Sequence, residues 1–199
     1  MPPDYHMHTP LCRHAEGEPT EYAAQAVKLG LTEIGFTEHA PMPGDGFDNW
    51  RMLESEMDIY HEKLDQAEKD NPEINILRSL EVDYLPDYTE WIKSLSNLYE
   101  WDYLIGSVHY LGDKWSFDHP DHRDSWHGKD LSSVWSQYYI RLIESVKIGV
   151  FNIIGHCDLI KVFGHRPDCD LSPLWIPFLE EVKNQDIAIE INTGGIKKP

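Results

Sequence analysis

The chain has 199 residues, of which 41% are hydrophobic and 26% are charged. These proportions are typical of a globular protein and exclude a disordered tail, and the length suits one domain or two small ones. No apolar run reaches the length of a membrane span, and the N-terminus lacks a signal-peptide pattern. We therefore expect a cytoplasmic protein with no membrane partner.

The chain is strongly acidic, with 35 Asp and Glu against 17 Lys and Arg and a net charge of −18. This field repels a nucleic-acid backbone, and no basic stripe offsets it, so we expect no nucleic-acid partner. It would also repel a small phosphorylated metabolite, unless bound divalent cations reverse the local sign. An oligomer is compatible with the sequence, but no pattern predicts one.

The three cysteines, Cys12, Cys157 and Cys169, are odd in number, widely spaced and never arranged as CxxC. This pattern argues against a disulfide framework and against a zinc finger. We expect reduced thiols, with Cys12 and Cys157 serving in packing, and any metal held by imidazole and carboxylate groups.

Strand-like and helix-like runs alternate along the chain. The first helix is expected to begin at an N-cap, Thr20, and to end just before Gly30. The alternation predicts parallel strands joined by right-handed crossovers. The expected strands are 4–9, 33–40, 75–84, 102–111, 150–159 and 187–195, and the expected helices are 19–30, 51–70, 86–99, 131–148 and 172–185.

Possible metal ligands recur at the C-terminal end of every expected strand. His6 and His8 share a face at i and i+2, and His14 follows in a loop. This recurrence favours a β/α barrel, which builds its site at that end, over an open doubly wound sheet. The later strand ends carry Glu38, His39, Glu81, Asp83, His109, His156, Asp158, Glu190 and Asn192.

The remaining five histidines do not share this placement. His61 is expected on a polar helix face, and His165 is a loop residue that could touch substrate. The loop "DHPDHRDSWHG" carries His119, His122 and His127, and we expect a solvated segment or a lid there.

Seven segments in order resemble the polymerase-and-histidinol-phosphatase (PHP) family of metal-dependent phosphoesterases, and most of all its histidinol-phosphate phosphatase branch. They are "DYHMHT", "CRHAEG", "GFTEHAP", "LEVDY", "GSVHY", "GHCDLIK" and "EINTGG-I-KKP". The resemblance implies an α/β fold, a distorted seven-stranded TIM-like (β/α)7 barrel holding up to three metals.

Carried over by position, the resemblance also implies the ligands. His6, His8 and Glu81 match the ligands of the first metal, and Glu81 would bridge to a second metal held by His109 and His156. His14 and His39 match the third site. The resemblance thus implies two or three ions, and ligands of this mixed type suit Zn, Fe or Mn.

The function implied is hydrolysis of a small phosphate monoester, L-histidinol phosphate, by a metal-bridging hydroxide, as a step of histidine biosynthesis. Glu81 and His109 would act in catalysis, and either Asp158 or a metal-bound water would protonate the leaving group. Arg13, Lys161 and Lys197 could bind the phosphate.

Three alternatives stay open. A mononucleotide or sugar phosphate could be the substrate of another PHP phosphoesterase. Amidohydrolases also carry HxH on their first barrel strand, although the early His14 and the "TEH" segment fit the phosphoesterases better. A non-catalytic metal-binding remnant is the third alternative.

That third alternative is motivated by the C-terminus, because the family's Asp-x-His on the seventh strand is absent from the sequence. We therefore expect residues 1–199 to form a single PHP-type domain with about six of the seven strands, lacking its C-terminal part.

Overall fold

A computed structural model describes residues 2–194 of the chain. These residues group into two compact units that alternate along the sequence. The first unit comprises Met1–Val82 and Ser94–Leu104, and the second comprises Asp83–Lys93 and Ile105–Pro199.

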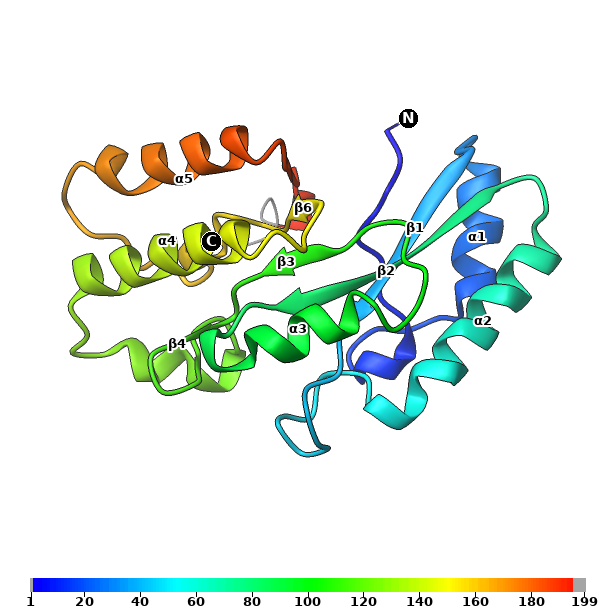
Figure 1. Ribbon diagram of the computed structural model, residues 1–199, viewed down its shortest axis with the longest axis horizontal. Helices are drawn as coiled ribbons and strands as arrows, with labels where there is room; N and C mark the ends of the chain where they lie inside the picture. The colour runs from blue at the N-terminus through cyan, green and yellow to red at the C-terminus, as the bar shows by residue number, and fades with distance from the viewer. Residues whose placement is uncertain (1, 195–199) are drawn as a thin grey trace. The chain divides into compact units, whose positions relative to one another are not determined.

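The first unit is built on a parallel strand pair, β1 (Glu33–His39) and β2 (Asn75–Asp83). Two helices, α1 (Pro19–Lys28) and α2 (Met57–Asp70), lie side by side next to these strands (Figure 1). Tyr60 of α2 is fully buried, and its hydroxyl lies 2.9 Å from the carbonyl oxygens of both Phe36 and Ser79. This contact joins the helix to both strands.

Helix α1 starts two residues earlier than the capping pattern predicts. Pro19 occupies the first turn, where its missing N–H costs nothing, and the Glu21 carboxylate accepts a 2.7 Å hydrogen bond from the Glu18 N–H. Thr20 is therefore inside the helix, and its assignment as N-cap is wrong. The predicted stop is confirmed, because Gly30 adopts a φ of 76° and Leu31 N–H donates to the Ala26 carbonyl.

The predicted first strand is reduced to a single β-bridge between Met7 and Phe36. The segment is nevertheless extended alongside β1, since Gly35 N–H donates to the Asp4 carbonyl and Thr37 N–H donates to the Met7 carbonyl. After Thr9 the chain turns into a short 3-10 helix, η1 (Pro10–Cys12).

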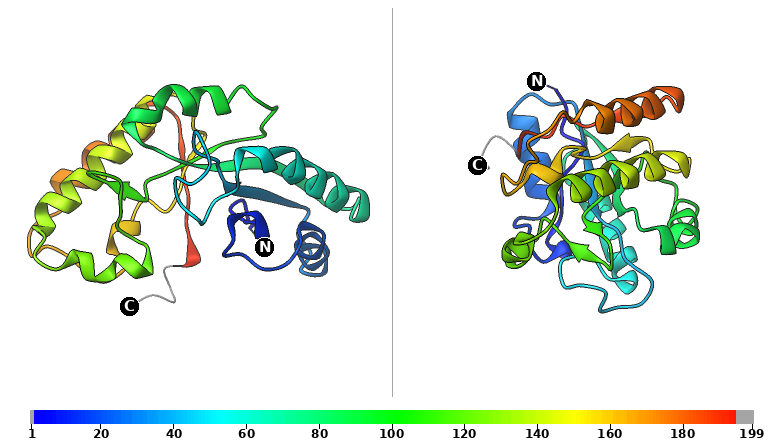
Figure 2. Two further views of the ribbon diagram at one scale, coloured as in Figure 1. Left: turned by 90° about the horizontal axis from the view of Figure 1, so that it is seen from below. Right: turned by 90° about the vertical axis from the view of Figure 1, so that its left-hand side faces the viewer.

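The second unit contains the parallel strands β3 (Ile105–Ser107), β6 (Ile153–Ile154) and β7 (Ala188–Ile189), in that order. Helices α4 (Leu131–Lys147) and α5 (Ser172–Asn184) run side by side, and α4 also packs against β3 (Figures 1 and 2). Helix α3 (Thr89–Leu95) is the shortest α-helix of the described residues.

The expected strand over 102–111 is split. After β3 the chain enters an antiparallel hairpin of β4 (Tyr110–Leu111) and β5 (Trp115–Ser116), which the sequence did not predict. The histidine-rich loop that follows forms a 3-10 helix, η4 (Pro120–Trp126), whose Trp126 is buried against Trp115 and Phe117. Residues 120–125 are exposed, which agrees with the expected solvated segment, and Trp126 is the exception.

Over residues 2–194, no helix combines the length and the apolar character that crossing a bilayer demands.

Candidate metal centre

Three imidazoles surround one buried carboxylate oxygen in the first unit. Oε2 of Glu81 lies 3.2 Å from Nε2 of His6, 3.5 Å from Nε2 of His8 and 3.0 Å from Nδ1 of His39. The Glu81 side chain is only 1% exposed. We call these four residues the Glu81 cluster.

The backbone explains why residues so distant in sequence meet. In the parallel pairing of β1 with β2, His39 is the register partner of Glu81. His6 and His8 flank Met7, whose bridge to β1 holds their segment beside the strand. Three chain segments therefore deliver the four side chains to one place.

His14 lies next to this cluster, as the sequence predicted. Its ring centroid is 5.2 Å from that of His39 and 5.8 Å from that of His8. Its Nδ1 lies 3.0 Å from the Cys12 carbonyl oxygen, so an Nδ1–H donating to that carbonyl leaves Nε2 available. Burial, followed by the nearby charge of His8, lowers the pKa of His14, which keeps the ring in the neutral form that binds metals.

Cys12 belongs to the same neighbourhood but is not reactive by itself. Ligand atoms of His8, Cys12 and His14 lie within 4.8 Å of one another. The thiol is fully buried and donates to the Thr9 carbonyl, and burial raises its pKa to about 11. A thiol so far from ionisation is a packing group, in agreement with the sequence analysis.

Trp50 closes one side of the Glu81 cluster. Its ring meets that of His39 edge-on at 4.7 Å, and the Arg51 guanidinium lies 4.5 Å from the Trp50 ring centroid. The sequence analysis missed Trp50, because it lies in an irregular loop where no periodicity links it to the histidines.

The second unit carries a second group of potential ligands. Nδ1 of His109 lies 2.7 Å from Oδ1 of Asp83, and both side chains are almost fully buried. The ring of His156 is 5.0 Å from that of His109, and Glu190 accepts a 2.6 Å hydrogen bond from the His156 N–H. We call His109, His156 and Asp83 the His109 group.

The candidate phosphate-binding cations are engaged in ion pairs. Arg13 donates to Glu56 at 2.6 Å, and Lys161 is paired with Asp158, whose side chain is 58% exposed. Lys197 lies outside the described residues.

Two histidines that the sequence does not predict as metal ligands pack against aromatic rings. The sequence predicts His61 on a polar helix face. Its ring is instead half-buried and stacks on that of Tyr99, with the ring centroids 4.2 Å apart. The ring of His165 stacks on Trp126 at 4.8 Å, while its carbonyl accepts a hydrogen bond from the Trp135 indole.

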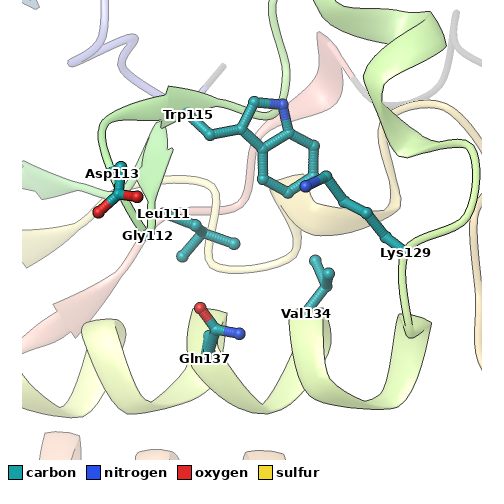
Figure 3. Close-up of a pocket in the computed structure, with 7 residues that line it drawn as sticks. All are labelled: Leu111, Gly112, Asp113, Trp115, Lys129, Val134 and Gln137. Atoms are coloured by element: carbon teal, nitrogen blue, oxygen red, sulfur yellow. The ribbon is translucent and has the colours of Figure 1, made fainter.

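A cavity of about 400 Å³ in the second unit lies between the β4–β5 hairpin and α4 (Figure 3). Within it, Nζ of Lys129 lies 4.1 Å from the Trp115 ring centroid. None of the predicted site residues lines this cavity, whose walls are Leu111, Gly112, Asp113, Trp115, Lys129, Val134 and Gln137.

The Glu81 cluster fits a divalent cation. Neutral imidazole nitrogens and a carboxylate oxygen are the donors that Zn, Fe and Mn bind in proteins. A buried carboxylate beside three imidazoles also leaves a negative charge that a cation would neutralise, and burying such a charge unpaired is costly. The donor set, the spacing and the burial therefore agree with a metal centre.

Strands that end in imidazole and buried carboxylate side chains define a metal-binding α/β protein. The match to a known family makes this class more specific. The chain belongs to the PHP domain family, whose model matches residues 4–194.

Curated relatives in this family are similar over nearly the whole chain. A "Probable histidinol-phosphatase" of Deinococcus radiodurans is 36% identical over 198 residues, which is 98% of this chain and 75% of the relative. The "Histidinol-phosphatase" of Bacillus subtilis is 29% identical over 222 residues, covering 98% of this chain and 81% of the relative.

Solved structures agree with the fold. A Listeria monocytogenes protein, crystallised as a candidate histidinol phosphatase, matches with a TM-score of 0.86 at 24% identity, covering 100% of this chain and 85% of the other. A Lactococcus lactis histidinol phosphate phosphatase, complexed with Zn, L-histidinol and phosphate, matches with a TM-score of 0.77 at 25% identity, covering 96% and 73%. The predicted fold class, the distorted β/α barrel of this family, is confirmed.

Proposed function

We propose that this protein is a metal-dependent phosphatase that hydrolyses L-histidinol phosphate to L-histidinol and phosphate in histidine biosynthesis. The observation that carries the proposal is the Glu81 cluster, found in a PHP-family chain that is 36% identical to a relative named histidinol-phosphatase. The Lactococcus structure supports the substrate, because L-histidinol and phosphate are the two products of this reaction.

We propose two or three divalent ions, Zn, Fe or Mn, as cofactors. Such ions, when bound, neutralise charge on the phosphate and lower the pKa of water. The Zn of the Lactococcus structure supports this assignment. The proposed ligands are His6, His8, His14, His39, Glu81, His109 and His156.

The protein's own residues would share the remaining tasks. Glu81, as a ligand, would keep its charge in a nearly dry environment, where electrostatic interactions are strongest. We propose Asp158, whose side chain is 58% exposed, as the proton donor to the leaving alkoxide. We propose Arg13, Lys161 and Lys197 as phosphate-binding cations; phosphate would displace Glu56 from Arg13 and Asp158 from Lys161.

A panel of substrates tests the proposal. Phosphate release is measured from histidinol phosphate, ribose 5-phosphate and adenosine monophosphate, each with added Zn, Fe or Mn. Hydrolysis of an amide and of a lactone is measured under the same conditions. We expect the highest kcat/KM for histidinol phosphate. A preference for the nucleotide or the sugar phosphate would assign another phosphoesterase activity, and cleavage of the amide or lactone would indicate an amidohydrolase. Tight metal binding without turnover would indicate a non-catalytic protein.

A further inference from the structure

Glu38 is a fully buried carboxylate that lies beside the Glu81 cluster and is not one of the proposed metal ligands. Its side chain is 0% exposed, although it carries a charge that water would otherwise stabilise. Such a group persists in a folded protein only where hydrogen bonds and charges compensate for the lost hydration.

Both carboxylate oxygens of Glu38 are engaged by neighbouring groups. Oε2 accepts hydrogen bonds from the N–H of Thr9, at 2.9 Å, and from the Thr9 hydroxyl. Oε1 accepts a 2.9 Å hydrogen bond from the N–H of His39 and lies 3.5 Å from Nδ1 of His8. With its oxygens occupied in this way, Glu38 has little capacity left to bind a metal directly.

We infer that Glu38 is the positioning residue of the metal centre, acting through His8 and His39. One carboxylate joins the segment that carries His8, through Thr9, to the strand end that carries His39. This inference rests on the proposed metal-dependent function.

The contact with His8 also has a consequence for its tautomer. An imidazole carries one proton when neutral, and the nitrogen without the proton is the one that can bind a metal. A carboxylate facing Nδ1 favours the proton on that atom, which leaves the lone pair on Nε2. That nitrogen is the one that faces Glu81, at 3.5 Å. Carboxylates that accept a hydrogen bond from a ligating histidine orient it in many metal sites, and Oε1 of Glu38 lies at 3.5 Å, on the side of His8 where such a bond would form.

Replacing Glu38 tests the inference through metal binding. In Glu38→Gln the side-chain NH2 must face either Thr9 or His39. Both residues present hydrogen-bond donors to this side chain, so the NH2 would face a donor and one hydrogen bond would be lost. We expect the zinc dissociation constant, measured by chelator competition, to rise by about 10- to 100-fold. Glu38→Asp keeps the charge on a shorter side chain, and we expect a smaller increase.

Glu33→Gln is the matched control, because it makes the same change at the other end of β1. Glu33 accepts hydrogen bonds from Tyr5 and Asn75 and is remote in register from His39. We expect its zinc affinity to equal that of the wild type.

A second readout separates positioning from general destabilisation. Two-bond 1H–15N spectra of the zinc-loaded protein report which ring nitrogen of His8 carries the proton. In the wild type we expect the proton of His8 on Nδ1 throughout. In Glu38→Gln we expect this single tautomer to be lost. Wild-type zinc affinity together with an unchanged His8 spectrum in Glu38→Gln would overturn the inference.

The outcomes also separate this inference from the proposed function. Failure of the wild-type protein to bind zinc would overturn both. Zinc binding that depends on Glu38, without hydrolysis of any phosphate ester, would overturn the proposed function alone. If Glu38→Gln does not fold, Glu38→Asp decides, and wild-type affinity in that variant together with an unchanged His8 spectrum would count against the inference.

Discussion

Individual carboxylates in this protein differ in task although they share burial. Glu81 presents one oxygen to three imidazoles, whereas Asp83, two residues later on β2, lies 2.7 Å from Nδ1 of His109. The first arrangement suits a metal ligand, and the second suits a residue that orients a ligand. Each role predicts a different result on substitution.

Replacing Glu81 by Gln should abolish turnover of histidinol phosphate, with a loss of at least about 100-fold in kcat, while the fold survives. A neutral amide is a poor ligand for the divalent ions that a carboxylate holds well. Steady-state kinetics and circular dichroism measure the two effects. Glu62→Gln, which removes an exposed charge on α2, is the control. Near-normal activity in Glu81→Gln would make Glu81 a structural acid.

Replacing Asp83 by Asn should be milder, with a fall of about 10-fold in metal affinity or kcat. The amide oxygen can still accept the His109 Nδ1–H, but without the negative charge that strengthens the hydrogen bond. Metal titration of the variant checks this, with Asp87→Asn as an exposed control. A loss as complete as that of Glu81→Gln would instead indicate that Asp83 binds metal directly.

At the scale of elements, β1 contributes His39 to the Glu81 cluster and packs closely against neighbouring segments. Gly35 has no side chain, and the Tyr103 ring occupies the space where a Cβ would project. The Tyr103 hydroxyl in turn donates to the Tyr5 carbonyl at 2.6 Å, next to His6. A glycine in mid-strand thus permits a contact that supports the first histidine segment.

Gly35→Ala should therefore lower the free energy of unfolding by about 1–3 kcal/mol through overpacking. Tyr103→Phe removes the hydroxyl, which is the atom nearest to the new methyl group. The double variant should lose less stability than the sum of the two single variants, because the substitutions share one contact. Urea unfolding of all four proteins measures the coupling, and simple additivity would contradict the proposed clash.

Helix α2 carries a histidine whose environment disfavours its charge. Burial, followed by the nearby Arg78 guanidinium, lowers the pKa of His61, and the charges of Asp65 and Asp58 only partly oppose this. Nδ1 of His61 lies 3.5 Å from the Arg78 guanidinium, and the ring stacks on Tyr99. The folded state therefore resists protonation of this ring more than the unfolded state does.

The stability of the protein should consequently fall as the pH drops through the unfolded-state pKa of histidine, about 6.5, because the unfolded chain then binds more protons. His61→Phe keeps an aromatic ring in the stack and removes the titration. We expect a flatter dependence of the unfolding free energy on pH between 7 and 5 in this variant. An identical pH dependence in the wild type and the variant would show that His61 does not contribute.

At the scale of the whole molecule, the net charge of −18 would repel a phosphorylated substrate. Bound cations would offset the acidic field where a phosphorylated substrate must enter. We also propose that the chain behaves as a single PHP-type domain. The sequence passes between the two compact units at 82–83, 93–94 and 104–105, so neither unit is a continuous piece of chain.

Thermal unfolding should accordingly show one transition, coincident in near- and far-ultraviolet circular dichroism. Zinc should raise the midpoint relative to EDTA, because a ligand that binds only the folded state stabilises it by about 2.7 kcal/mol at 100 times its dissociation constant. Two separate transitions would contradict the single-domain proposal.

The sequence by itself determined the order of elements and the identity of the candidate ligands. Alternating strand-like and helix-like runs predicted α1, β1, α2, β2, α4 and α5 to within a few residues, except at the start of α2. The i, i+2 spacing of His6 and His8 and the family resemblance named the residues of the Glu81 cluster. These signals are local, because they depend on periodicity and on neighbours in the chain.

Only the tertiary structure decided which carboxylate faces which imidazole. No spacing relates Glu38 to Thr9 or Asp83 to His109, because these contacts join segments 26 to 29 residues apart. Tertiary packing likewise limits the predicted first strand to a bridge at Met7. It also places the His61 ring in a stack with Tyr99, although the helical pattern predicts a polar face there. The sequence therefore determined the ligand types, whereas the hydrogen bonds that orient them depend on the folded chain.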